Sequence, residues 1–172
     1  MKLGIISDTH ITANYEKDKV STLINQFKLA FKDVDEIIHA GDICEIFFLN
    51  MIKEIAPTRC VKGNFDNIEN LDLFIKFSIG PYNIGVIHIL PDNVEDFVKK
   101  QDIQILIFGH THQPLIKGTN FNVLLLNPGS PTMPKAPIER PGFMKPIARP
   151  SVITLNIDEN DILSTFIINL KL

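Results

Sequence analysis

The chain has 172 residues, of which 45% are hydrophobic and 22% are charged, and its formal net charge is −3. This length suits one domain with a buried core, and so small a charge offers no general attraction to nucleic acid or an anionic membrane. No apolar run reaches the roughly 18 residues that a membrane span needs, and Asp8 comes too early for a signal peptide. We therefore expect one cytoplasmic domain over residues 1–172, with Cys44 and Cys60 reduced because neither fits a disulfide framework or a metal spacing.

The first half of the chain alternates between apolar strands and amphipathic helices. A strand over 2–7 precedes a helical pattern over 20–31, a strand over 36–39 precedes a helix over 45–55, and a third strand covers 58–62. Such alternation predicts parallel strand–helix–strand units. Open sheets of this kind place their sites beyond the carboxyl ends of the strands.

The second half is richer in strands. A hairpin over 74–79 and 83–89 leads to a helix over 92–100, which we expect Asp92 to cap, and then to an apolar strand over 103–108. Further strands are expected over 114–117, 123–127, 151–157 and 161–168. The predicted fold class is therefore α/β, with two mixed β-sheets packed face to face and helices outside.

One segment, residues 128–150, has a biased composition. It holds seven of the eleven prolines. Two interpretations stay open, a stiff surface loop with solvated charges and a cationic flap over the site. The cations of this Pro-rich segment are Lys135, Arg140, Lys145 and Arg149.

Side chains of metal-ligand type follow the expected strands at five places. These are Asp8-Thr9-His10, Gly41-Asp42, Gly63-Asn64-Phe65-Asp66, His88 and Gly109-His110-Thr111-His112. Taken singly, each stretch is also typical of a turn, a helix entry or a buried core histidine. Taken together, polar groups at this density are costly to bury without a cation, so they favour a two-metal site. His39 lies outside them, and we expect it behind the ligands or in the core.

The chemistry of these side chains fits such a site. An aspartate and a histidine two residues apart on a loop, such as Asp8 and His10, can both turn toward one cation. The carboxylate of Asp42 can bridge two cations, and two imidazoles two residues apart can address neighbouring ions. Asn64 offers a neutral amide oxygen, which binds a metal only beside charged ligands.

The order D-x-H, G-D, G-N-x-D, H, G-H-x-H resembles that of the calcineurin-like metallophosphoesterases. The short chain and its Asn127-Pro128-Gly129-Ser130 look like their small single-domain phosphodiesterase branch, and the resemblance extends from Lys2 to about Ile157. It implies a four-layer αββα sandwich. It also implies two divalent ions bridged by Asp42, one held by Asp8, His10 and His112 and the other by Asn64, His88 and His110.

This resemblance implies a phosphodiesterase in which a hydroxide bridging the two metals attacks phosphorus, with Asp42, Asn64 and His110 positioning the hydroxide and the phosphate. The mixed ligands favour Mn²⁺, with Ni²⁺, Fe²⁺ or Zn²⁺ as alternatives, and no organic cofactor is expected. The expected partner is a small phosphate ester, and a homo-oligomer is compatible with this interpretation.

Two departures from the family pattern keep a second function open. Many relatives have a histidine where this chain has Phe65, which cannot protonate a leaving group. Relatives also commonly show His-Gly-His where this chain has His88-Ile89-Leu90. The alternative is a protein-interaction scaffold of weak or no activity, similar to the retromer subunit built on this fold.

Overall fold

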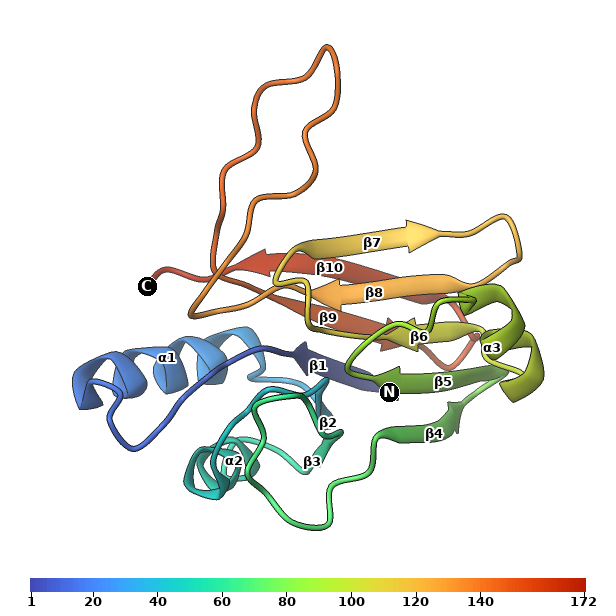
Figure 1. Ribbon diagram of the computed structural model, residues 1–172. Coiled ribbons are helices and arrows are strands. Elements are labelled where there is room, and N and C mark those ends of the chain that lie inside the picture. The colour runs from blue at the N-terminus through green and yellow to red at the C-terminus, as the bar shows by residue number, and fades with distance from the viewer.

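The computed structural model describes residues 1–172 and contains ten strands and three helices. They form two five-stranded sheets that lie face to face, with helices on the outside (Figure 1). The first sheet has the order β10-β9-β1-β2-β3. Its strands are β1 (Lys2–Ile6), β2 (Glu36–His39), β3 (Thr58–Cys60), β9 (Ser151–Ile157) and β10 (Leu163–Asn169).

The second sheet has the order β4-β5-β6-β8-β7. Both sheets are mixed, because β1, β2 and β3 run parallel beside the antiparallel pair β9 and β10, while β5, β6 and β8 run parallel between antiparallel β4 and β7. The predicted α/β fold with two mixed sheets is confirmed. The strands are β4 (Phe74–Ile79), β5 (Tyr82–Ile87), β6 (Ile105–Ile107), β7 (Pro114–Gly118) and β8 (Leu124–Pro128).

Three apolar clusters hold the four layers together. Aliphatic side chains such as Ile5, Val86 and Ile153 fill the space between the sheets. The helices α1 (Lys17–Ala30) and α2 (Ile46–Lys53) cover the outer face of the first sheet, and α3 (Val94–Gln101) covers that of the second. The first helix layer lies so close that a Cβ at Gly4 would come within 2.8 Å of the Phe31 ring.

Several element ends differ from the sequence-based prediction by one to three residues. The prediction that Asp92 caps the third helix is wrong, because the side chain of Asn93 accepts a hydrogen bond from the amide of Asp96 at 3.1 Å. His88 follows β5 instead of lying within the strand. It therefore stands on a loop at the carboxyl end of the sheet, where a side chain is free to turn toward its neighbours.

The Pro-rich segment joins β8 to β9 and projects from the body as a long loop, drawn in orange in Figure 1. Its tip exposes apolar side chains, including Phe143 and Met144. None of the three helices combines the length and the apolar character that crossing a membrane requires.

Candidate metal centre

Five of the predicted ligands converge at the carboxyl ends of β1, β2 and β5 and on the loop after β6. They form two groups that share Asp8. Within each group, one donor atom from every residue lies within 4.8 Å of the others. The members are Asp8, His10 and His112 in the first group, and Asp8, Asp42 and His88 in the second.

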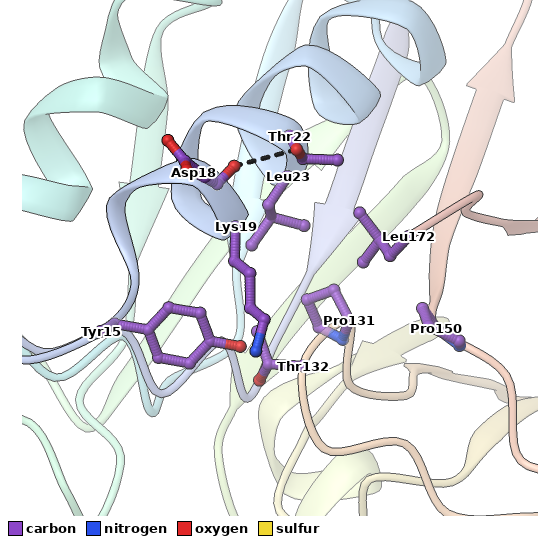
Figure 2. Close-up of a pocket in the computed structure, with 9 residues that line it drawn as sticks. All are labelled: Tyr15, Asp18, Lys19, Thr22, Leu23, Pro131, Thr132, Pro150 and Leu172. Atoms are coloured by element: carbon purple, nitrogen blue, oxygen red, sulfur yellow. Dashed lines mark hydrogen bonds between the residues drawn. The ribbon is translucent and has the colours of Figure 1, made fainter.

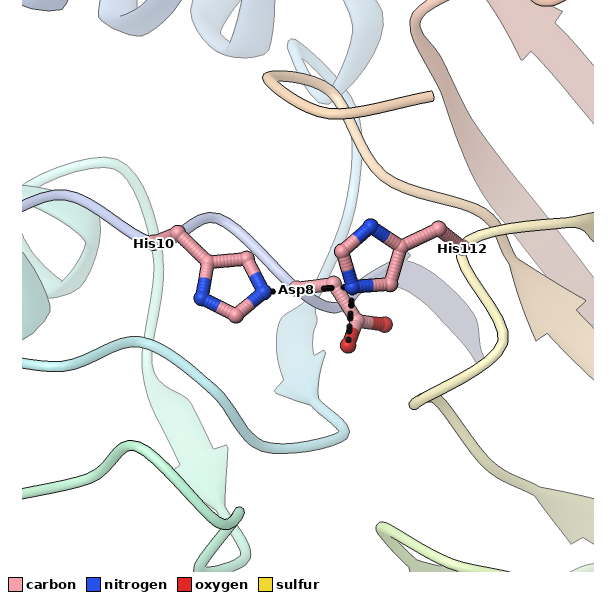
Figure 3. A group of neighbouring side chains, drawn as sticks. All are labelled: Asp8, His10 and His112. Atoms are coloured by element: carbon pink, nitrogen blue, oxygen red, sulfur yellow. Dashed lines mark hydrogen bonds and ion pairs between the residues drawn. The ribbon is translucent and has the colours of Figure 1, made fainter. Parts of the chain in front are cut away.

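In the first group the rings of His10 and His112 direct their Nε2 atoms toward each other beside the Asp8 carboxylate (Figure 3). The two Nε2 atoms are 3.2 Å apart, and His112 Nε2 lies 3.4 Å from Asp8 Oδ1. His10 Nε2 also lies 3.7 Å from Asp42 Oδ2. These three nitrogen and oxygen donors therefore point at one small volume, and Asp42 adjoins it.

In the second group, Asp42 lies on the loop after β2 of the first sheet and approaches His88, which follows β5 of the second sheet. Its Oδ2 lies 3.2 Å from His88 Nε2, and the other carboxylate oxygen accepts a hydrogen bond from the amide of Phe65 at 2.9 Å. Asp42 is thus the one carboxylate that lies within 4 Å of an imidazole nitrogen from each group, His10 in the first and His88 in the second. This is the geometry that a shared ligand needs.

The backbone at the centre adopts an unusual conformation. Five candidate ligands, none of them glycine, have positive φ angles between 48° and 67°. Left-handed backbone costs about 1–2 kcal/mol at each such residue and is found where the surrounding structure enforces it, often at functional sites. Here the loops are fixed to each other, since Asp8 N donates to Gly41 O and His10 N donates to Asp42 O, both at 3.0 Å. The five residues are Asp8, His10, Asp42, His110 and His112.

Two of the imidazoles are oriented by backbone carbonyls. His88 Nδ1 lies 2.8 Å from Ala40 O, and His112 Nδ1 lies 2.9 Å from Met133 O. In each case the carbonyl accepts the Nδ1 proton, so that in the neutral ring Nε2 is the unprotonated nitrogen and is directed into the centre. His88 is only 3% exposed, and its Nε2 makes no hydrogen bond.

Burial and charge shift the pKa values of this cluster. Burial raises the pKa of Asp8 above its ordinary value. Burial acts in the same direction on Asp42, but its interactions with His88 and the Phe65 amide outweigh this and leave its pKa below the ordinary value. For His88, burial lowers the pKa, whereas the Asp42 carboxylate, the Ala40 carbonyl and the Asp8 carboxylate together raise it by more. The centre therefore holds two buried carboxylates beside imidazoles, and a cation would favour the ionised form of both carboxylates.

Asp66, to which the sequence analysis assigned no role, holds the loop of Asp42 in place. Its buried carboxylate accepts hydrogen bonds from the amides of Asp42 at 3.0 Å, Cys44 at 2.6 Å and Gly63 at 2.6 Å. A Cβ at Gly63 would collide with the Asp42 carboxylate, so only glycine allows this approach. The sequence feature that could have indicated this role is an aspartate three residues after a glycine.

The base of the Pro-rich segment is joined to the Asp8 loop. The hydroxyl of Ser130 donates to Asp8 O at 2.7 Å, and that of Thr132 donates to Thr9 O at 2.8 Å. On the other side of this loop, the fully buried His39 lies with Nε2 3.1 Å from the Thr9 hydroxyl. His39 therefore supports the ligand loop from behind, in line with the sequence-based expectation.

The other two predicted ligands, Asn64 and His110, lie at the rim with exposed side chains. The ring of His110 packs edge-on against His88, with centroids 5.3 Å apart, and its amide donates to the Asp8 carboxylate at 3.0 Å. Phe65 is 67% exposed and its ring meets His10 edge-on at 5.4 Å. No proton donor therefore occupies the position of Phe65.

A separate cavity of about 480 Å³ lies between α1 and the base of the Pro-rich segment (Figure 2), and none of the candidate ligands lines it. The ammonium of Lys19 beside it is paired with Glu16 at 2.6 Å. The cavity contains no histidine and is not the candidate centre. Its lining consists of Tyr15, Asp18, Lys19, Thr22, Leu23, Pro131, Thr132, Pro150 and Leu172.

The donor set fits divalent transition metals. Two carboxylates and three imidazoles converge, two of the imidazoles direct Nε2 into the centre, and Nε2 of His88 is buried without a hydrogen-bond partner. Imidazole and carboxylate together suit ions such as Mn²⁺, Fe²⁺, Ni²⁺ and Zn²⁺, whereas Ca²⁺ prefers oxygen alone. The arrangement can hold and polarise a phosphate ester once cations are bound.

Comparisons with known proteins identify the family of this chain. The family model described as the calcineurin-like phosphoesterase superfamily domain matches residues 1–146. A probable metallophosphoesterase of Methanothermobacter thermautotrophicus is 34% identical over 166 residues, which cover 92% of this chain and 87% of the relative.

Two solved structures have similar folds. An archaeal phosphodiesterase superposes with a TM-score of 0.69 at 25% identity, covering 98% of this chain and 100% of that one. Vps29 of Entamoeba histolytica in complex with Zn²⁺ superposes with a TM-score of 0.68 at 22% identity, covering 98% and 99% of the two chains. The second likeness concerns the fold alone.

Proposed function

The chain belongs to the calcineurin-like phosphoesterase superfamily, and we propose that it is a metal-dependent phosphodiesterase using two divalent ions, with Mn²⁺ preferred. The observation that carries this proposal is the convergence of two carboxylates and three imidazoles at the carboxyl ends of the strands, with Asp42 within 4 Å of both His10 and His88. A small phosphate ester is the proposed substrate, and the cytoplasm is the proposed location.

In this proposal Asp8, His10 and His112 hold one ion and His88 holds the other, with Asp42 between them. Asn64 and His110, which lie at the rim, would complete the second site and face the substrate. When bound, two such ions attract the phosphate, stabilise charge on its oxygens and lower the pKa of a shared water.

The protein's own groups make three contributions. The carbonyls of Ala40 and Met133 keep His88 and His112 in the tautomer that presents Nε2. The low pKa of Asp42 keeps its carboxylate ionised at neutral pH. The burial of these groups excludes water, which strengthens every electrostatic interaction at the site.

Phe65 supports a choice between ester classes. Because no side chain at this position can protonate a departing alkoxide, the site favours esters with good leaving groups. Monoesters of simple alcohols would suffer most. We therefore propose diesters as the preferred substrates.

The test is hydrolysis of bis-p-nitrophenyl phosphate by protein that has been freed of metal with EDTA and then reloaded with Mn²⁺. We expect activity to require the metal and kcat/KM to fall at least about 100-fold in Asp42→Ala. Asp33→Asn, a change at an exposed carboxylate, is the control and should behave as wild type. Activity that needs no metal and ignores Asp42→Ala would refute the proposal.

A scaffold without catalysis is the second candidate, and Phe65 is the observation that favours it. A protein that has lost catalysis needs no proton donor at this position, and the exposed ring offers an apolar contact instead. A stoichiometric protein partner, together with no hydrolysis under Mn²⁺, Ni²⁺, Fe²⁺ or Zn²⁺, would favour the scaffold. The retained donors argue for the enzyme, since a decayed site has no reason to keep them.

A further inference from the structure

A second hollow, of about 240 Å³, opens directly beside the candidate metal centre. His88 and Asn64 form its wall on the side of the centre. Its lining also includes aliphatic side chains, among them Leu73 at 72% exposure and Ile89 at 44%. Neither side chain belongs to the three apolar clusters of the fold, and apolar surface beside a few polar groups is common in binding sites.

We propose that this hollow binds the organic group that a phosphodiester retains after hydrolysis, and that the group is a single ring or a short alkyl chain. This assignment rests on the proposed phosphodiesterase function and adds a substrate class to it. Leu73 and Ile89 are its specificity-determining residues.

The size of the hollow suits a single ring. A cavity of about 150 Å³ accommodates one benzene ring in a protein interior, so 240 Å³ has room for one substituted ring, and larger groups would extend into solvent. The aliphatic side chains of Leu73, Ile87 and Ile89 in the lining match an apolar group. Lys62 also contributes to the lining, but it is exposed, and a lysine stem can cover apolar surface while its ammonium stays in water.

Charge distinguishes the retained group from the leaving group. The leaving oxygen gains negative charge as its bond to phosphorus breaks, and an aliphatic wall cannot stabilise such a charge. The retained ester oxygen gains no full charge, so its substituent can be bound in apolar surroundings without cost. The leaving group would therefore depart toward solvent, where Phe65 is exposed.

The test compares two substrates that share a leaving group. Bis-p-nitrophenyl phosphate retains an aromatic ring, and methyl p-nitrophenyl phosphate retains only a methyl group. We expect Leu73→Ser to lower kcat/KM for the aromatic diester about 10-fold and to leave the methyl diester within about twofold of wild type. Leu29→Ser is the matched control, because Leu29 is 68% exposed on α1 and remote from the hollow.

The outcomes separate this proposal from the proposed function. Equal losses for both diesters in Leu73→Ser would place the leaving group in the hollow and overturn the proposal. Unchanged kinetics for both diesters would overturn it as well, while leaving the phosphodiesterase function intact. Hydrolysis of neither diester by wild-type protein loaded with Mn²⁺ would refute the function and this assignment together. Melting temperatures of both variants, expected within about 2 °C of wild type, check that the fold is retained.

Discussion

Replacing Asp66 by asparagine should disrupt the centre without touching a proposed ligand. The carboxylate of Asp66 accepts three backbone hydrogen bonds, two at Oδ2 from Asp42 and Gly63 and one at Oδ1 from Cys44. Asparagine has one acceptor oxygen and one amide nitrogen of nearly the same shape. In either orientation at least one backbone N–H then faces another donor.

The expected loss follows from these contacts. A hydrogen bond to a charged group contributes about 1.5–3 kcal/mol, and leaving a buried donor unpaired costs about 1–3 kcal/mol. We therefore expect Asp66→Asn to lower the free energy of unfolding by about 3 kcal/mol. For a chain of this size, each kcal/mol shifts Tm by roughly 2–4 °C, so the melting temperature should fall by about 10 °C.

The same change should weaken metal binding, because Asp66 positions the loop that carries Asp42. Loss of such a supporting contact typically lowers metal affinity 10–100-fold. Calorimetric melting and Mn²⁺ titration of Asp66→Asn beside the exposed control Asp33→Asn measure both effects. A saturating concentration of Mn²⁺ should restore part of the activity. An Asp66→Asn protein that melts within about 2 °C of wild type and binds Mn²⁺ equally well would show that the reasoning is wrong.

Two further predictions concern pH and the Pro-rich segment. Burial lowers the pKa of His39 to about 4, so the unfolded chain binds the proton more tightly, and stability should decrease by about 3 kcal/mol as the pH falls from 6.5 to 4. Urea denaturation across this range should show a shallower pH dependence in His39→Gln, and equal slopes would contradict the assignment. If the Pro-rich segment acts as a cationic flap, Lys135→Ala combined with Arg140→Ala should raise KM for the diester severalfold at unchanged kcat. Unchanged kinetics would identify the segment as a plain surface loop.

Much of the fold was predictable because its signals are local. Hydrophobic periodicity located the strands and helices, and the strand–helix alternation before residue 62 predicted the parallel order of β1, β2 and β3. The ends of elements were less predictable, since they depend on which atoms find hydrogen-bond partners. The cap at Asn93 illustrates this, because Asp92 and Asn93 are both good capping residues and only the chain's path selects one.

For the candidate site, the sequence by itself determined which side chains stand at the carboxyl ends of strands, since a polar residue that ends an apolar run is visible without coordinates. Only the tertiary structure decided which of them meet. It brought Asp8, Asp42 and His88 within ligand distance, left Asn64 at the rim and assigned Asp66 to the support of Asp42. The physical reason is that such contacts join loops from different strands, so their distances depend on how two sheets pack and not on any spacing along the chain.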